Sequence, residues 1–188
     1  MVVLPEMTLT GFTMDAHTVA EPAQGSATVS SFEGLARAYA VHIAFGVVLH
    51  GRTRPRNTLV VAGPDGEVAR YAKVHPFTYA GEAEAYEAGD SLVVAAVGGM
   101  RFGLSICYDL RFAEQYASLA PHVDAFLVIA NWPARRIAHW EVLLRARAIE
   151  TQAWVLGVNR TGVDGNGVEY PPSTHVFSPR GDAVQPEV

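Results

Sequence analysis

Two residue types capable of chemistry occur only once in this sequence of 188 residues. Cys107 is the only cysteine, and Lys73 is the only lysine among fourteen Lys and Arg residues. A thiolate is a strong nucleophile, and an ammonium can face a negatively charged oxygen that develops during a reaction. All other basic residues of this type are arginines. The single lysine therefore suggests a site that needs an ammonium group, which is a compact charge whose pKa changes readily on burial. These two residues are therefore the first candidates for chemistry.

The surroundings of Cys107 favour an exposed nucleophile. The residue follows a predicted strand and precedes a predicted helix, where a turn would expose the thiol and nearby N–H groups would stabilise a thiolate. A lone cysteine is more commonly an inert buried thiol. However, Tyr108, Asp109 and Arg111 are too polar for a strand that continues into a core.

Glu6 and Lys73 also lie at predicted strand ends. Glu6 follows a short apolar strand and a proline, and burial there would raise the pKa of its carboxyl so that it serves as a general base near neutral pH. Taken one at a time, each residue is more commonly a solvated surface charge. The same holds for Glu82, which lies in a predicted acid-rich loop over residues 74–90.

Other catalytic arrangements find less support in the sequence. His75 and His139 are the most motif-like of the seven histidines, but neither has a partner at metal-ligand spacing, and one cysteine cannot form a thiolate zinc site. The composition is also compatible with a Cys–His protease, but no local sequence signature supports one. The run GVDGNG over 162–167 is predicted to be a turn rather than a phosphate loop, because no helix pattern follows it.

The elements that must position these residues alternate between strands and helices. Apolar runs predict strands over 1–4, 42–50, 57–63, 92–97, 102–106, 124–131 and 153–159, a hairpin that ends at residue 73, and two short strands around a turn at 179–182. Helical spacing predicts helices over 26–39, 112–119 and 134–152, the last with an inward face of Ile137, Trp140, Leu144 and Ala148. This order predicts a single α/β domain over 1–188 with mixed sheets.

Composition excludes several classes of protein. Nineteen acidic residues against fourteen basic ones leave no positive field for a nucleic-acid backbone, so no nucleic-acid partner is expected. One cysteine cannot form an internal disulfide, and the start of the chain lacks a secretory signal, so we expect a cytoplasmic protein. No apolar run approaches the length of a membrane span, and no membrane partner is expected.

Longer blocks of the sequence resemble the nitrilase superfamily of carbon–nitrogen hydrolases. They are VVLPEMTLTGF, YAKVHPF, GEAEAYEAGD, GLSICYDLRFAE and the run from NWPARR to GVDGNG, which together span nearly the whole chain. The LPEM, CYDLRF, NWP and ARAIE-Q segments are most similar to the bacterial omega-amidase branch. The resemblance implies an αββα four-layer sandwich of two mixed β-sheets, and we expect a homodimer or higher homo-oligomer.

The resemblance also implies a reaction. Glu6, Lys73 and Cys107 would be the catalytic set, Glu82 would orient the lysine and the substrate, and the backbone N–H of Tyr108 would help Lys73 to hold the oxyanion. The implied activity is hydrolysis of a short omega-amide, such as 2-oxoglutaramate, to a carboxylate and ammonia through a thioester, with water as the second substrate and with no metal or organic cofactor. Nitrilases of the superfamily carry Trp–Glu after the cysteine, whereas this chain has Tyr–Asp, which favours an amide over a nitrile.

A dicarboxylic monoamide would need a cation for its distal carboxylate. Arg111 is the candidate by position, although an ion pair with Asp109 or Glu114 explains that residue equally well. Further candidates for the lining of the substrate pocket are Phe12, Trp132 and Thr174.

The sequence departs from the family pattern in two respects. Where Tyr-x-Gly-x-Ser is usual, residues 170–174 read YPPST, and proline fixes a backbone that glycine leaves free. The family's first strand and helix and its last strands are also missing, so we expect a sandwich truncated at both ends. A catalytically inactive remnant that acts as a structural or binding subunit is therefore the competing hypothesis. A thiol redox sensor would need a resolving cysteine from another chain.

Overall fold

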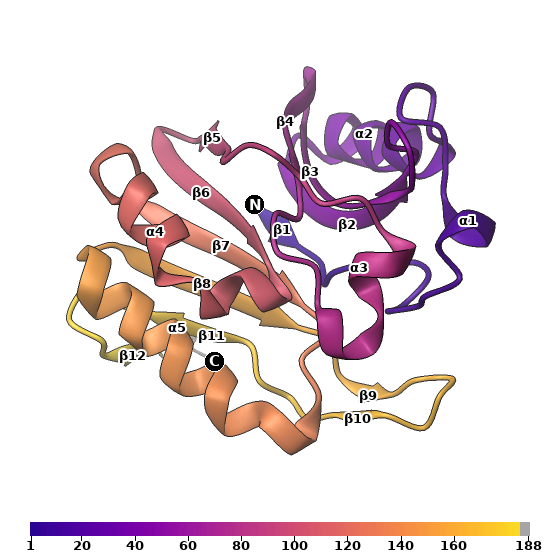
Figure 1. The fold of residues 1–188 in the computed structure, drawn as a ribbon. Coiled ribbons are helices and arrows are strands. Elements are labelled where there is room, and N and C mark those ends of the chain that lie inside the picture. Colours follow the sequence, from indigo (N-terminus) through magenta and orange to yellow (C-terminus); the bar gives the residue numbers. More distant parts are fainter. Residues whose placement is uncertain (185–188) are drawn as a thin grey trace.

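Two β-sheets packed face to face form the centre of the molecule, and helices cover the outer face of each sheet (Figure 1). The structure is a computed structural model that describes residues 1–184. The layer order is helix, sheet, sheet, helix, which confirms the predicted αββα sandwich with two mixed sheets.

The first sheet, sheet A, is built entirely from the first 72 residues. Its strands lie in the order β1 (Val2–Val3), β2 (Ile43–Leu49), β3 (Arg56–Gly63) and β4 (Gly66–Ala72). β1 pairs in parallel with β2, and the other neighbours are antiparallel. All seven residues of β2 and seven of the eight in β3 are buried, because both faces of these strands are covered.

The second sheet, sheet B, contains the remaining long strands. Its order is β12 (Ala183–Val184), β11 (His175–Phe177), β8 (Trp154–Asn159), β7 (Ala125–Ala130), β6 (Met100–Ile106) and β5 (Val94–Val97). The central strands β6, β7 and β8 are parallel, and the outer pairs are antiparallel. A separate hairpin is formed by β9 (Gly162–Val163) and β10 (Glu169–Tyr170).

The helices sit on opposite outer faces. α2 (Ala27–Tyr39) packs on sheet A, whereas α4 (Ala113–Leu119) and α5 (Ile137–Thr151) pack on sheet B. Two shorter helices, α1 (Ala16–Val19) and α3 (Glu82–Ala85), lie in the loops at one end of sheet A (Figure 1). Trp140, Leu144 and Ala148 of α5 are fully buried and Ile137 packs against them, which confirms the predicted inward face.

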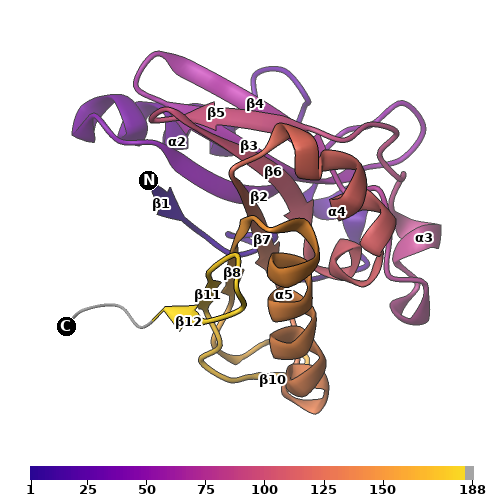
Figure 2. The same ribbon diagram turned by 90° about the vertical axis from the view of Figure 1, so that its left-hand side faces the viewer.

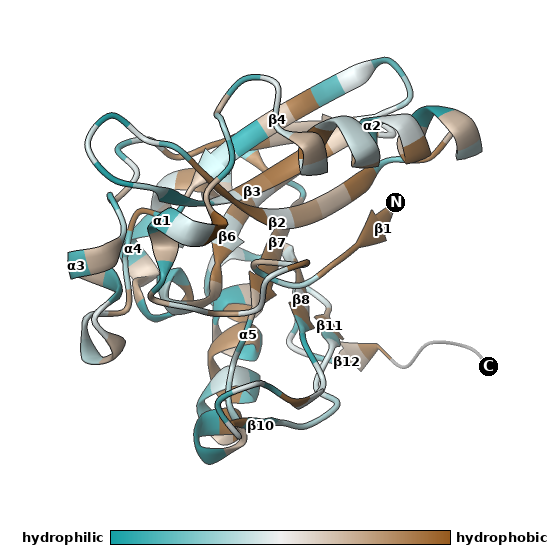
Figure 3. Ribbon diagram, turned by 90° about the vertical axis from the view of Figure 1, so that its right-hand side faces the viewer, coloured by the Kyte–Doolittle hydropathy of each residue, from teal (hydrophilic) through white to brown (hydrophobic). Residues whose placement is uncertain are grey.

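Apolar side chains fill the space between the sheets. This central cluster combines Leu59, Val61 and Tyr71 of sheet A with residues such as Leu104 and Leu127 of sheet B, all at most 1% exposed. β2 and β3 accordingly carry the brown of hydrophobic residues along much of their length (Figure 3). β1 and β12 are each an edge strand, and both lie on the same side of the molecule (Figure 2).

The structure corrects some of the expectations. The predicted loop over 74–90 contains a 3₁₀ turn (Thr78–Ala80) and α3, and helix α1 and the β9–β10 strands were not predicted. Helical spacing predicts one apolar face on residues 26–39, formed by Val29, Phe32, Leu35, Ala36 and Tyr39. Leu35 and Tyr39 are exposed, so that prediction is wrong for these two. The last predicted strand is present at Ala183–Val184, and residues 185–188 lie outside the described residues. In the described part of the chain no helix is long and apolar enough to cross a membrane.

Candidate active site

Cys107 occupies a sharp turn at the end of a central strand. β6 ends at Ile106, and a 3₁₀ helix over Cys107–Arg111 begins at once. The turn requires a φ of +47° at Cys107, a left-handed value that costs a residue with a Cβ about 1–3 kcal/mol and is typical of functional sites. The thiol lines a cavity beyond the strand end, so the predicted position of Cys107 at a strand-to-helix turn is confirmed, but the residue is half-buried rather than exposed.

Glu6 and Lys73 meet beside this turn, although they lie 67 residues apart in the chain. Glu6 follows β1, Lys73 follows β4, and both are at most 2% exposed. The backbone at Glu6 passes so close to β2 that a Cβ added to Gly46 would lie 2.2 Å from the nitrogen of Met7. A glycine in β2 therefore lets the chain carry Glu6 to the end of the sheet.

Lys73 lies between two buried carboxylates. Its Nζ is 3.1 Å from Oε1 of Glu6 and 2.8 Å from Oε2 of Glu82, the first residue of α3. Burial alone would lower the pKa of Lys73, but the charges of Glu6 and Glu82 outweigh burial and hold that pKa well above its ordinary value. Lys73 is therefore a fixed cation. The structure brings Glu6, Lys73 and Glu82 together beside Cys107, the set that the family resemblance implied.

Two asparagines that sequence reasoning missed complete the site. Asn57 in β3 donates from Nδ2 to Glu6 at 2.7 Å and to Glu82 at 3.0 Å. Asn131, directly after β7, donates its backbone N–H to Oε2 of Glu6 at 2.8 Å and its side-chain amide to the Glu6 carbonyl at 2.7 Å. Both lie at strand ends, one in the NTLVVAG strand and one in the NWP segment, and that position was the available signal.

Burial and the charges beside Cys107 set the protonation state of its thiol. Burial, followed by the negative charge of Glu6, raises the pKa of the Cys107 thiol well above its ordinary value, and the Lys73 ammonium offsets only part of this. The resting site therefore holds a neutral thiol next to a hydrogen-bonded carboxylate. Such a pair suits general-base activation of the thiol during the reaction rather than a permanent thiolate.

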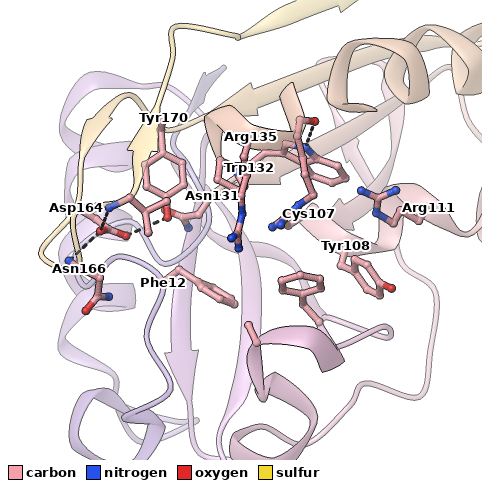
Figure 4. A pocket seen from close by; sticks show the side chains of 15 residues that line it. Phe12, Cys107, Tyr108, Arg111, Asn131, Trp132, Arg135, Asp164, Asn166 and Tyr170 are labelled. Carbon is pink, nitrogen blue, oxygen red and sulfur yellow. Dashed lines mark hydrogen bonds between the residues drawn. The ribbon is translucent and has the colours of Figure 1, made fainter. Parts of the chain in front are cut away.

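A cavity of about 170 Å³ opens over Cys107. Asp164, Asn166 and Tyr170 border it on one side, and Tyr108 and Arg111 on the other, with the thiol between them (Figure 4). The predicted lining residues Phe12 and Trp132 are both present. Thr174 is exposed and is not among the residues that line this cavity, because Trp140 holds the neighbouring Ser173 carbonyl against α5.

Arg111, Arg135 and Arg136 line the same cavity. Of these three, only Arg111 was selected from the sequence. Within residues 1–184 no carboxylate lies within 4 Å of the guanidinium of Arg111, Arg135 or Arg136. The ion pair of Arg111 with Asp109 or Glu114, the alternative considered above, does not form. Arg111 instead stacks over Trp132 at 5.0 Å. The NWPARR run, with two consecutive arginines after a strand end, was the signal for the other two.

Burial and the neighbouring guanidinium groups act together on this cluster. Burial, followed by the charge of Arg135, lowers the pKa of Arg136, and Arg111 contributes in the same direction. Arg136 lies over the ring of Phe77 at 5.0 Å. A cavity with three guanidinium groups and no ion-paired carboxylate among the described residues is suited to a small anion.

The family model and the sequence relatives of this chain point to the same family. The carbon–nitrogen hydrolase family model matches residues 1–186. The chain is 39% identical to omega-amidase YafV of Escherichia coli K12 over 184 residues, which are 98% of this chain and 71% of that protein. It is 42% identical to 2-oxoglutaramate amidase of Paenarthrobacter nicotinovorans over 135 residues, 68% of this chain and 46% of that protein.

A solved structure agrees with the sequence relatives. The CN-hydrolase superfamily protein XC1258 from Xanthomonas campestris, which carries an arsenic adduct in its active site, superposes with a TM-score of 0.91 at 35% identity. The superposition covers 97% of this chain and 71% of that one. The fold, the matched family model and these relatives together show that the chain belongs to the carbon–nitrogen hydrolases of the nitrilase superfamily.

Proposed function

We propose that this protein hydrolyses the terminal amide of a short dicarboxylic monoamide, such as 2-oxoglutaramate, with Cys107 as the nucleophile. The observation that carries the proposal is the buried Glu6–Lys73–Glu82 cluster beside Cys107, a thiol that lines the same cavity as three arginines. Similarity to an omega-amidase and a 2-oxoglutaramate amidase supports the substrate class.

In the proposed first half-reaction, Glu6 takes the proton from the Cys107 thiol while the sulfur attacks the amide carbon. The carbonyl π electrons move to oxygen, and the resulting oxyanion accepts hydrogen bonds from the Lys73 ammonium and the backbone N–H of Tyr108. When the C–N bond breaks, the nitrogen takes the proton back from Glu6 and leaves as ammonia. The product on the enzyme is a thioester.

Water completes the reaction in the second half. Glu6 removes a proton from water, the hydroxide attacks the thioester carbon, and the C–S bond breaks. The thiolate regains a proton from Glu6, and the carboxylic acid leaves and gives its own proton to solvent. The donors that surround Glu6, from Asn57, Lys73 and Asn131, hold its carboxylate in one orientation through both proton transfers.

The arginine cluster would hold the distal carboxylate of the substrate. A monoamide with a free carboxylate can pair with guanidinium groups that have no other anionic partner among residues 1–184. The short length of the proposed substrate rests on the similarity to the omega-amidase and the 2-oxoglutaramate amidase. Arg111, Arg135 and Arg136 are the candidates for this contact.

The test is ammonia release from three compounds: 2-oxoglutaramate, succinamate and butyramide, the last having no carboxylate. We expect turnover of the two carboxylate-bearing amides and a kcat/KM at least about tenfold lower for butyramide, since a hydrogen-bonded charge pair is worth more than 1.4 kcal/mol. Cys107→Ala should abolish turnover, and Arg136→Gln should raise KM for 2-oxoglutaramate much more than for butyramide. Equal ammonia release by the wild type and Cys107→Ala would refute the assignment.

A further inference from the structure

One buried carboxylate next to the nucleophile takes no part in the proposed chemistry. Asp109 is 0% exposed and lies two residues after Cys107 in the 3₁₀ turn. Its Oδ2 accepts hydrogen bonds from the backbone N–H of Ile106 at 2.9 Å and the hydroxyl of Tyr71 at 2.8 Å. Its Oδ1 accepts the backbone N–H of His75 at 2.9 Å and lies 3.0 Å from Nδ1 of the same residue.

The positions of these partners define what Asp109 connects. Ile106 directly precedes Cys107 and is the last residue of β6 in sheet B. Tyr71 and His75 lie two residues before and two residues after Lys73, at the end of β4 in sheet A. A single carboxylate thus joins the backbone next to the nucleophile to both sides of the catalytic lysine.

The partners of Asp109 are themselves held in place. The Tyr71 hydroxyl accepts the backbone N–H of Val74 and the side-chain amide of Gln115, both at 3.2 Å, while it donates to Asp109. Burial, followed by the charge of Asp109, raises the pKa of Tyr71 well above its ordinary value, so this residue stays a phenol and a donor. The His75 ring stacks on Phe112, with 3.7 Å between the ring centroids.

We propose that Asp109 is a positioning residue that holds the left-handed turn at Cys107 against Lys73, and so fixes the nucleophile relative to its base and its oxyanion partner. A φ of +47° at a cysteine needs surrounding contacts that maintain it, and Asp109 supplies the hydrogen bond to the peptide N–H that precedes it. This role rests on the proposed function, but the reactivity of the thiol can be measured without any amide substrate.

Asp109→Asn tests the role with almost no change of shape. The amide has one acceptor oxygen for four donor contacts, so its NH₂ group must face either Ile106 and Tyr71 or His75. Because a displacement of about 1 Å at a reacting group can cost about 10²-fold, we expect kcat to fall by about that factor while KM changes little. The rate constant for iodoacetamide alkylation of Cys107 at pH 7.5 should fall in parallel.

Two further variants separate positioning from general stability. Tyr71→Phe removes one of the four contacts and should lower both rates by about tenfold, the scale of one hydrogen bond to a charged group. Asp124→Asn is the matched control, because Asp124 also accepts a backbone N–H, from Arg101 at 2.8 Å, but lies at the far end of β6. It should leave kcat and the alkylation rate of folded protein unchanged.

The outcomes distinguish this role from the proposed function. All rates refer to folded protein, with the concentration of sites taken from the final stoichiometry of alkylation. If the wild type releases no ammonia from any amide but Asp109→Asn still slows alkylation, positioning stands and the proposed function fails. If Asp109→Asn does not fold, Tyr71→Phe decides. Wild-type kcat and alkylation rates in Tyr71→Phe, or in a folded Asp109→Asn, would overturn the proposal.

Discussion

Replacement of Lys73 by methionine should reveal how strongly the two buried carboxylates depend on one cation. The variant keeps an unbranched apolar stem of similar volume but removes the ammonium, and so leaves Glu6 and Glu82 without a cation in the interior. Breaking a buried ion pair by removal of one partner typically costs about 3–5 kcal/mol. We expect the lower end, about 3 kcal/mol, because Asn57 still donates to both carboxylates and Asn131 to one of them.

The loss of stability in Lys73→Met should depend on pH in a definite direction. In the wild type the raised pKa of Lys73 contributes stability throughout pH 5–8, and that stability is lost only as the pH rises through the folded-state pKa, above the ordinary lysine range. In the variant, two like charges share one site, which raises the pKa of one carboxyl. Such a group contributes stability at low pH that is lost as the pH rises, so the deficit of the variant should grow from pH 5 to pH 8.

Urea denaturation, followed by tryptophan fluorescence at pH 5, 6.5 and 8, measures these stabilities. A loss of about 3 kcal/mol corresponds to a fall of about 6–12 °C in Tm for a chain of this size. The double variant Lys73→Met with Glu82→Gln should recover at least half of the loss, because only one carboxylate remains. Arg101→Met, which breaks an exposed ion pair with Asp124, is the control and should cost less than about 1 kcal/mol.

A pH-independent loss of stability that Glu82→Gln does not relieve would refute this account of the cluster. The stabilising effect of Lys73 would then come from the packing of its methylene groups and not from its charge.

Three further predictions concern other parts of the molecule. Asn57→Leu removes a donor shared by two buried carboxylates and leaves their oxygens with fewer partners, so urea denaturation should show a loss of about 1–3 kcal/mol. Gly46→Ala would place a Cβ 2.2 Å from the backbone nitrogen of Met7. Urea denaturation should show a loss of about 1–3 kcal/mol in the free energy of unfolding, and most of the activity should be lost as well. Gly34→Ala, in open space on α2, should instead raise the free energy of unfolding by about 0.5–1 kcal/mol. Ser26→Ala removes the side-chain cap of α2, in which Oγ accepts the Val29 N–H at 3.0 Å, and a Tm measurement should show a loss of about 1 kcal/mol.

The sequence was informative where a residue type was rare or a pattern was long. Cys107 and Lys73 were selected by single occurrence, and the buried stripe of α5 followed from its 3.6-residue period. Resemblance to a family added Glu6 and Glu82, and the structure places both against Lys73. The order of strands and helices was sufficient for the layered fold, because buried strands are apolar throughout.

The contacts that could not be predicted all join distant segments. Asn131 reaches Glu6 across 125 residues, and Asn57 reaches it across 51. No local pattern marks an asparagine as a donor to a carboxylate so far away in the sequence. Arg135 and Arg136 were overlooked because their significance lies in the absence of acidic partners within the described chain, which depends on tertiary structure. The expected self-association stays a prediction.

The division of the two sheets along the chain affects how the enzyme must assemble. The last strand of sheet A ends at residue 72 and the first strand of sheet B begins at residue 94, so each sheet draws its strands from its own part of the described sequence. The base and the cation belong to the first half, and the nucleophile belongs to the second. Neither half alone contains the full set, so recovery of activity during refolding reports the docking of the layers and is expected to lag behind the formation of secondary structure.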